Sequence, residues 1–171
     1  MSFIPTLDLL SALKIRLAAL ELSPGVKAFE QVEYYSQPRL IQALQDLRLF
    51  KNRVCLIVPD DDVYEHSLEG RVLDTHCLRS VILLFADRDV GRRQDASTGD
   101  PSGTPGVIKL NQLVVDDLLG HSLGFDEGRV RPDVGGPILI EGKDREHSTG
   151  REAWHLDLTI EAGTAITTHD P

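Results

Sequence analysis

One pentapeptide in this chain matches a motif that can perform nucleophilic chemistry. Residues 120–124, Gly-His-Ser-Leu-Gly, fit the GxSxG pattern, in which a tight turn between a strand and a helix exposes a serine hydroxyl to a histidine base. The surroundings of Ser122 favour another structure, because a helical pattern precedes the motif and the segment 125–128 follows it without helical character. Few residues remain downstream for the acid and histidine of a triad. We interpret the motif as a helix end and turn, and keep a small serine hydrolase as the enzymatic alternative.

The carboxylates and thiols are not spaced as metal ligands. Asp60, Asp61 and Asp62 are consecutive, and three consecutive side chains of a turn cannot all converge on one cation, so we interpret them as a solvated turn. Cys55 and Cys77 each stand in an apolar run, where a thiol is most often a small buried hydrophobic group. We expect no metal, no cofactor and no disulfide framework. Three isolated histidines are interpreted as structural: His66, His76 and His121.

The composition indicates one domain, residues 1–171, with an aliphatic core. Hydrophobic residues make up 41% of the chain but aromatic residues only 5%, so Leu, Ile and Val must supply most of the buried area. The N-terminal sequence has no basic leader, and no window approaches the roughly 18 apolar residues of a membrane span. We expect a protein made in a reducing cytoplasm, without membrane contact.

The net charge of −9 argues against general nucleic-acid binding. Residues 1–50 hold five acids and five bases, so the negative excess falls in residues 51–171. A surface that follows phosphates needs a stripe of bases, whereas the only compact basic run is Arg92-Arg93, with aspartates close by. We therefore expect no sequence-specific nucleic-acid binding.

Apolar spacing near the N-terminus predicts two helices. Leucines at spacings of three and four predict an amphipathic helix over residues 7–20, with Thr6 as its N-cap. The leucines of this stripe are Leu7, Leu10, Leu13, Leu17 and Leu20. Residues 26–35 are weakly typical of an extended segment, and Pro38 suits the first position of a second helix over residues 38–48.

Two apolar runs in the middle of the chain predict strands. Residues 54–58, closed by Pro59, indicate a central strand covered on both faces. Residues 71–85 are rich in β-branched and apolar side chains, which favours one long strand or two joined by a kink near His76. A twenty-residue polar loop, 87–106, follows directly.

The C-terminal part predicts a third helix and a hairpin. Residues 107–118 have helical spacing, and Gly120 stands where a C-terminal glycine is expected. Residues 137–142 predict a strand, joined by a charged turn to a strand that begins at Trp154 and alternates apolar with polar side chains. A short tail, 163–171, ends the chain. The fold class predicted is α+β, with a mostly antiparallel sheet flanked by two to three helices and a long β-to-α loop.

The loop 87–106 is the first candidate interface. It contains only two apolar side chains and cannot bury a core of its own. A loop of this length inside a compact domain usually contacts something else. Because arginine is favoured at interfaces, we expect Arg88, Arg92 and Arg93 to contact partners.

The polar face of the last predicted strand is the second candidate interface. Its residues are His155, Asp157, Thr159 and Glu161. On an edge or near-edge strand, such a face has to be paired or protected. Copies of the chain in a ring, or a helix of the same chain, would provide that protection.

The order of these elements resembles that of the tail terminator proteins of tailed bacteriophages, and of the related minor tail proteins of contractile-tailed phages. The similarity covers residues 5–162 and rests on the N-terminal helix, the VCLIVP run, the long strand before the loop, the Leu118-Leu119-Gly120 helix end and the final Trp-bearing strand. The helix predicted at 38–48 and the length of the loop exceed the plainest form of that family. A neighbouring neck or connector role therefore stays open.

The resemblance implies a structural virion protein rather than an enzyme. It implies a hexameric ring on the last ring of the tail tube, which stops tube growth and offers the surface on which the neck docks. The implied partners are further copies of the chain, the tail tube protein, the sheath protein of a contractile tail and a neck or connector protein, with DNA passing through the ring. The implied location is the virion tail, after synthesis in the host cytoplasm. A monomeric or dimeric binding module of the bacterial host is the remaining alternative.

Overall fold

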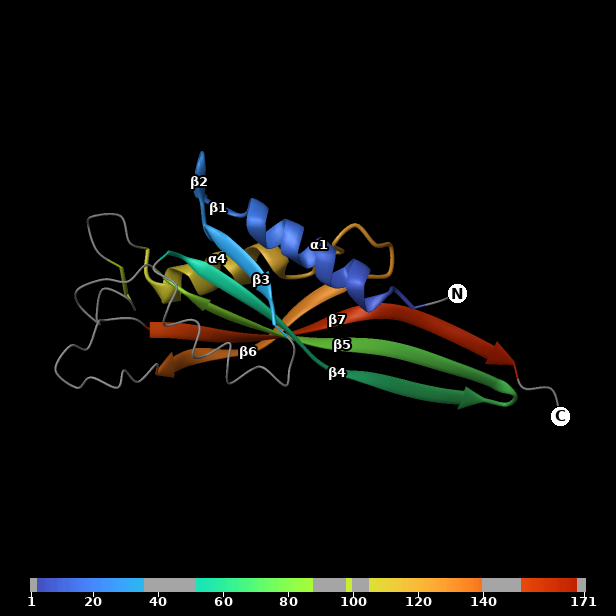
Figure 1. Ribbon diagram of the computed structural model, residues 1–171. Helices are drawn as coiled ribbons and strands as arrows, with labels where there is room; N and C mark the ends of the chain where they lie inside the picture. Colours follow the sequence, from blue (N-terminus) through green and yellow to red (C-terminus); the bar gives the residue numbers. More distant parts are fainter. Residues whose placement is uncertain (1–2, 36–51, 88–97, 100–104, 140–151, 169–171) are drawn as a thin grey trace.

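The computed structural model describes residues 3–35, 52–87, 98–99, 105–139 and 152–168, which form a mixed α+β structure built mostly of strands (Figure 1). The elements are α1 (Thr6–Ala19), β1 (Glu21–Ser23), β2 (Val26–Lys27), β3 (Gln31–Tyr34), β4 (Val54–Glu69), β5 (Val72–Ala86), α4 (Val107–Leu118), β6 (Arg129–Leu139) and β7 (Glu152–Thr168). The predicted helix at 38–48 lies outside the described residues.

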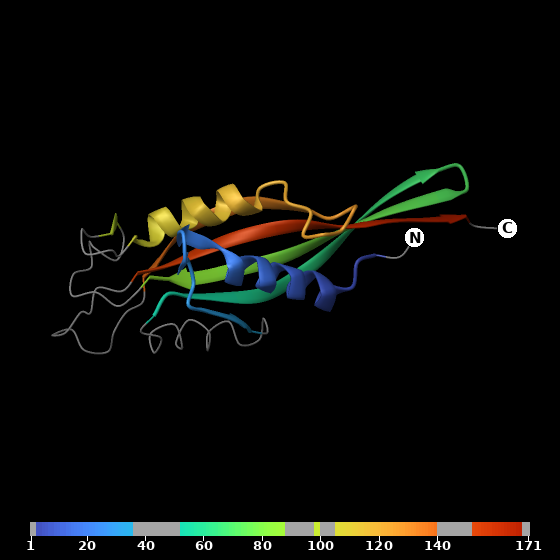
Figure 2. The same ribbon diagram turned by 90° about the horizontal axis from the view of Figure 1, so that it is seen from above.

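Five strands form one sheet in the order β3-β4-β5-β7-β6, and β1 and β2 form a small hairpin beside it. The β3–β4 pair is parallel and the other three pairs are antiparallel, so the sheet is mixed. The parallel pair is possible because the chain between Tyr34 and Val54 is long enough for a crossover. Helices α1 and α4 lie on one face of this sheet, side by side (Figure 2).

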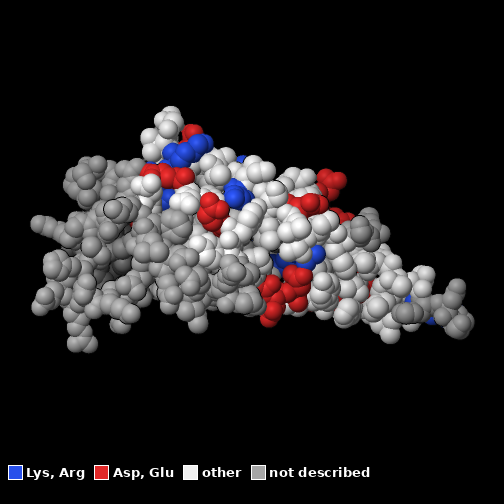
Figure 3. Space-filling view, in the orientation of Figure 1, with Lys and Arg blue, Asp and Glu red and all other residues white. Residues whose placement is uncertain are grey.

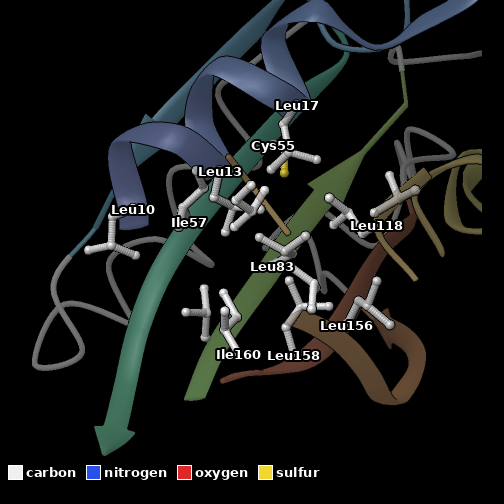
Figure 4. Packing of buried hydrophobic residues seen from close by; sticks show 14 of the residues in the cluster. Leu10, Leu13, Leu17, Cys55, Ile57, Leu83, Leu118, Leu156, Leu158 and Ile160 are labelled. Carbon is white, nitrogen blue, oxygen red and sulfur yellow. The ribbon is translucent and has the colours of Figure 1, made fainter. Parts of the chain in front are cut away.

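The main core lies between this face and the two helices (Figure 4). Leu9, Leu13 and Leu17 of α1 are fully buried against it. Leu7, predicted as part of the same stripe, is 79% exposed instead, because at 3.6 residues per turn it is rotated about 120° from Leu13. The predicted N-cap is also wrong: Pro5 occupies that position and Thr6 is the first helical residue.

Strand β4 confirms part of its prediction. Residues 54–58 are buried, with β3 on one side and β5 on the other. The expected end at Pro59 and the expected turn at Asp60–Asp62 are both wrong, since the strand continues to Glu69. A register shift between Pro59 and Asp62 accommodates the proline, which has no N–H to donate, and pairing with β5 then resumes.

Strand β5 is one strand, with a register shift relative to β7 between His76 and Leu78, where the sequence predicts a kink. The hairpin of β6 and β7 is confirmed, although β6 begins at Arg129 rather than at residue 137. Strand β7 continues to Thr168, so most of the predicted tail, 163–171, is strand. The predicted alternation of apolar and polar side chains along β7 is present, because Leu156, Leu158 and Ile160 face the core.

Helix α4 confirms the predicted third helix. Val107, Leu110, Val114 and Leu118 are buried, and Gly120 follows the helix end with a φ of 71°. Arg16 of α1 donates to Asp117 of α4 through Nε at 2.8 Å and Nη2 at 2.5 Å. This bidentate bond, which also raises the pKa of Arg16, links the two helices above the sheet.

Replacing a core leucine of α1 will show how much this helix contributes to stability. We expect Leu13→Ala to lower the free energy of unfolding by about 2–5 kcal/mol, because it removes a fully buried side chain and leaves a cavity. Ile15→Ala is the matched control on the same helix, since Ile15 is 67% exposed and its loss should change stability by less than about 0.5 kcal/mol. Urea denaturation followed by circular dichroism measures both. Equal losses would contradict this account of the core.

Candidate interface on the outer sheet face and the β-arm

The polar residues predicted on the last strand do share one face of β7, opposite the helices. His155, Asp157, Thr159 and Glu161 alternate with the buried residues that face the core. Of the two predicted positions, edge or near-edge, β7 takes the near-edge one, with β5 paired on one side and the edge strand β6 on the other along residues 152–161. Its backbone therefore needs no protection by another copy of the chain, and an interface here would use side chains only.

These side chains form a polar row that continues onto β6. The Thr159 hydroxyl donates to the Asp133 carboxylate across the two strands, and Arg131 Nε donates to the same carboxylate at 3.1 Å. His155 Nδ1 lies 3.4 Å from an oxygen of Asp157. The row is a satisfied, solvent-facing network, of a kind that sets specificity at an interface more than affinity.

The loop predicted to contact partners is described only at its base. Arg88, Arg92 and Arg93 lie outside the described residues. At the base, the buried carboxylate of Asp87 accepts a hydrogen bond from the N–H of Gly106 at 2.6 Å. The bond joins the end of β5 to the start of α4, so both ends of the loop are fixed to the core.

At the other end of the molecule the sheet extends beyond its helices. We define the β-arm as residues 63–69 of β4, 72–77 of β5 and 164–168 of β7. Neither helix reaches over it, and it projects from the core in both views (Figures 1 and 2). Gly70, with a φ of 63°, makes the two-residue turn between β4 and β5.

All three strands are irregular where the β-arm joins the core. We call this level, at Pro59–Asp62, His76–Arg79 and Gly163, the root of the β-arm. The register shifts at Pro59/Asp62 and at His76/Leu78 flank Arg79, and Gly163 in β7 has a φ of 102°. The buried Arg79 guanidinium donates to the carboxylate of Asp62 and, at 3.0 Å, to the carbonyl of Ile4. One side chain thus connects β5, β4 and the segment that precedes α1.

Tyr64 and Cys77 next to this root, and Cys55 in the main core, have altered ionisation. Burial raises the pKa of the Cys55 thiol strongly, and burial also raises that of Cys77, against the opposing effect of Arg79. The pKa of Tyr64 is raised, first by the neighbouring Cys77 and then by burial and Asp62. Both cysteines are buried free thiols, as the sequence predicts. Protonated, buried thiols are poor nucleophiles, so these groups serve packing.

The two faces of the β-arm differ in charge. On the face that continues the helix-covered side, register places Tyr64 opposite Cys77, His66 opposite Thr75 and Ala165, and Leu68 opposite Leu73 and Thr167. Those residues include no carboxylate, lysine or arginine. The opposite face carries Glu65, Glu69, Asp74 and His76, with His76 Nε2 3.4 Å from Asp74.

The β-arm also exposes large apolar side chains, and most of its described surface is uncharged in Figure 3. Those side chains are Val63, Tyr64, Leu68, Val72 and Ile166. The sequence predicted the β5 part of this region, within the strand 71–85, but not the β4 part. The signal was present as the alternating VYEHSLE segment followed by Gly70-Arg71, a two-residue hairpin turn, but the preceding aspartates indicated a turn instead.

The serine motif lies in a turn between α4 and β6. A helix precedes it and a strand follows it, the reverse of the strand-to-helix order that exposes a nucleophilic serine. His121 Nδ1 accepts the N–H of Leu123 at 2.9 Å, and the backbone of Gly120 donates to Val130 at 2.8 Å. This turn fixes the start of β6.

Two other kinds of site are not found among the described residues. They contain no group of three or more His, Cys, Asp or Glu side chains placed to hold a metal ion. No helix in the described part of the chain is long and apolar enough to cross a membrane. In comparisons with known proteins, no family model matches the chain and no curated protein matches its sequence.

Removing the Arg79 guanidinium tests whether this residue orients the β-arm. We expect Arg79→Met to lower the free energy of unfolding by about 1–3 kcal/mol, because Asp62 and the Ile4 carbonyl lose their donor. Hydrogen exchange should quicken in the β-arm and stay slow in β5 residues 81–86. Arg131→Met, which removes an exposed ion pair on β6, is the control and should change neither. Unchanged exchange in the β-arm of Arg79→Met would show that the bulges alone hold it.

Proposed function

We propose that this chain is a structural virion protein that closes the end of a phage tail tube as a ring and offers the surface for head-to-tail joining. The observation that carries the proposal is the elongated sheet, which has a helix-covered core at one end and an uncovered, partly apolar β-arm at the other (Figure 1). A ring subunit needs separate surfaces for its neighbours and for the components above and below it. This shape supplies them.

The order of elements supports the same proposal. The elements on which the resemblance rests are present: the N-terminal helix, the run 54–58 buried in β4, the long β5 before the loop and α4 ending just before Gly120. The final hairpin with Trp154 closes the sheet through β6 and β7. A hexameric ring on the last ring of the tail tube is the assembly that this resemblance implies.

The charge of the chain suits a ring through which DNA passes. An acidic inner surface would repel phosphates and let DNA slide without binding, and the net charge of −9 is compatible with such a surface. The neighbours would be the tail tube protein, the sheath protein in a contractile tail, and a neck or connector protein. We keep a neck or connector role as the second candidate, because the length of the 87–106 loop favours a longer reach than a plain terminator has.

The loop and the ring can be tested together. We expect a variant lacking residues 92–103 to fold, because the Asp87–Gly106 bond closes the base of the loop outside the deletion. It should nevertheless fail to cap tails, since the arginines of the loop are assigned to partner contacts. The measurement is electron microscopy of tubes made by co-expression with the tail tube protein of the same virus. Tubes of uniform length with a terminal ring are expected for the full chain, and tubes of unregulated length for the deletion.

Two outcomes would count against this function. Normal capping by the deletion variant would remove the loop from the interface, and tubes of unregulated length with the full chain would remove the terminator role.

The serine hydrolase alternative has its own test. We expect no difference in ester hydrolysis between the full chain and Ser122→Ala, because Ser122 lies in a helix-to-strand turn. A p-nitrophenyl ester series, followed by absorbance, measures this. Turnover by the unmodified chain that Ser122→Ala abolishes would establish the enzyme and end the structural proposal.

A further inference from the structure

Helix α1 has a stripe on its outer side whose only charged residue is Asp8. Leu7 is 79% exposed and Ile15 is 67% exposed, and Ser11, Ala18 and Ala19 are exposed with them on the side opposite the buried leucines. Surface helices normally place charged side chains there. In α1 the two basic residues instead flank the stripe, and both form ion pairs. Lys14 pairs with Glu33, and Arg16 pairs with Asp117. Asp8 is the one charged residue of α1 that lies on the stripe.

The β-arm has a matching uncovered surface. Its uncharged face, around Tyr64, Leu68 and Leu73, continues the side of the sheet on which α1 and α4 already pack. A helix laid along this face would extend a packing arrangement that the protein itself uses. Leu68 is 67% exposed, and Tyr64 contacts Phe3 edge-to-face with ring centroids 5.8 Å apart, so this face already packs against an aromatic side chain next to its root.

These two surfaces cannot meet within one molecule. The outer stripe of α1 points away from the sheet because the opposite side of the helix is buried against it. We propose that the outer stripe of α1 in one copy of the chain seats on the uncharged face of the β-arm of a second copy. This inference rests on the proposed ring, and it names the contact that joins neighbouring subunits.

Electrostatics favour a second copy as the occupant. Each copy carries a net charge of −9, so copies meet with least repulsion where carboxylates are fewest, and between these two surfaces Asp8 of the stripe is the only one. The opposite face of the β-arm, with Glu65, Glu69 and Asp74, would repel an acidic neighbour. A basic partner would be expected to use that acidic face, whereas the uncharged face fits a stripe with one charged residue.

The size of the contact explains why it would favour a closed ring. Three strands spaced about 4.8 Å apart and about six residues long offer roughly 300 Å² of flat area. Stable pairwise interfaces bury about 800 Å² per partner, so one such contact is weak. The contact is heterologous, because it joins different surfaces of the two copies, and every copy in a closed ring makes it twice.

A charge exchange between the two surfaces provides the test. Ile15→Lys places a positive charge on the stripe and Leu68→Glu places a negative charge on the β-arm, and each alone should weaken self-association about tenfold or more. A variant that carries both substitutions should recover association, since the introduced ammonium group of one copy then faces the introduced carboxylate of the next. Sedimentation equilibrium up to about 1 mM protein measures the association constants.

Ile166→Glu is the matched control, because Ile166 is 68% exposed on the β-arm but belongs to the opposite face. It should leave self-association within about twofold of the unmodified chain. The proposal is overturned if the full chain stays monomeric at the highest concentration, if Leu68→Glu associates like Ile166→Glu, or if the double variant shows no recovery. Rings that persist in Leu68→Glu would overturn this contact and leave the proposed function intact. Charge-dependent pairing that yields only open filaments would support the contact and count against the ring.

Discussion

The difference in rise between strands and helices determines the shape of this molecule. A strand advances about 3.3 Å per residue and a helix about 1.5 Å, so β7, with 17 residues, spans roughly 56 Å, while α1, with 14, spans roughly 21 Å. Two helices laid side by side on one face cannot cover strands of that length. The three longest strands therefore continue beyond the core as the β-arm, and apolar side chains such as Leu68 and Ile166 stay in contact with solvent.

The β-arm keeps a defined direction because its root is held by more than strand pairing. Bulges increase local twist, and here they fall at the same level of neighbouring strands. Arg79 lies between these bulges and donates hydrogen bonds to the Asp62 carboxylate and the Ile4 carbonyl. A buried guanidinium without its partners would be costly, so the arrangement favours one orientation of β4 relative to the N-terminal segment. A subunit that must close a ring depends on such a fixed angle.

Periodic patterns in the sequence predicted the elements that pack against one another. The alternation after Trp154 and the spacing in residues 107–118 identified β7 and α4, because both are half buried and their burial follows the backbone period. The β4 part of the β-arm was missed because its period-two pattern mixes apolar residues with carboxylates on a surface that contacts no core. The polar face of β7 and its near-edge position were predicted correctly, whereas β6 begins at Arg129 rather than at residue 137.

The sheet edges carry features that disfavour edge-to-edge pairing of copies, which is consistent with the face contact proposed above. Beyond the end of β3, the free edge of β4 carries Asp60, Asp61 and Glu65, and charges on an edge discourage pairing with another strand. The free edge of β6 contains Pro132 and Pro137, which have no N–H to donate. At the exposed end of β7, the Glu127 carboxylate approaches the N–H of Thr164 at 3.4 Å. A contact between a helix and the face of the β-arm needs no free strand edge, so it is compatible with these edges and with a closed number of subunits.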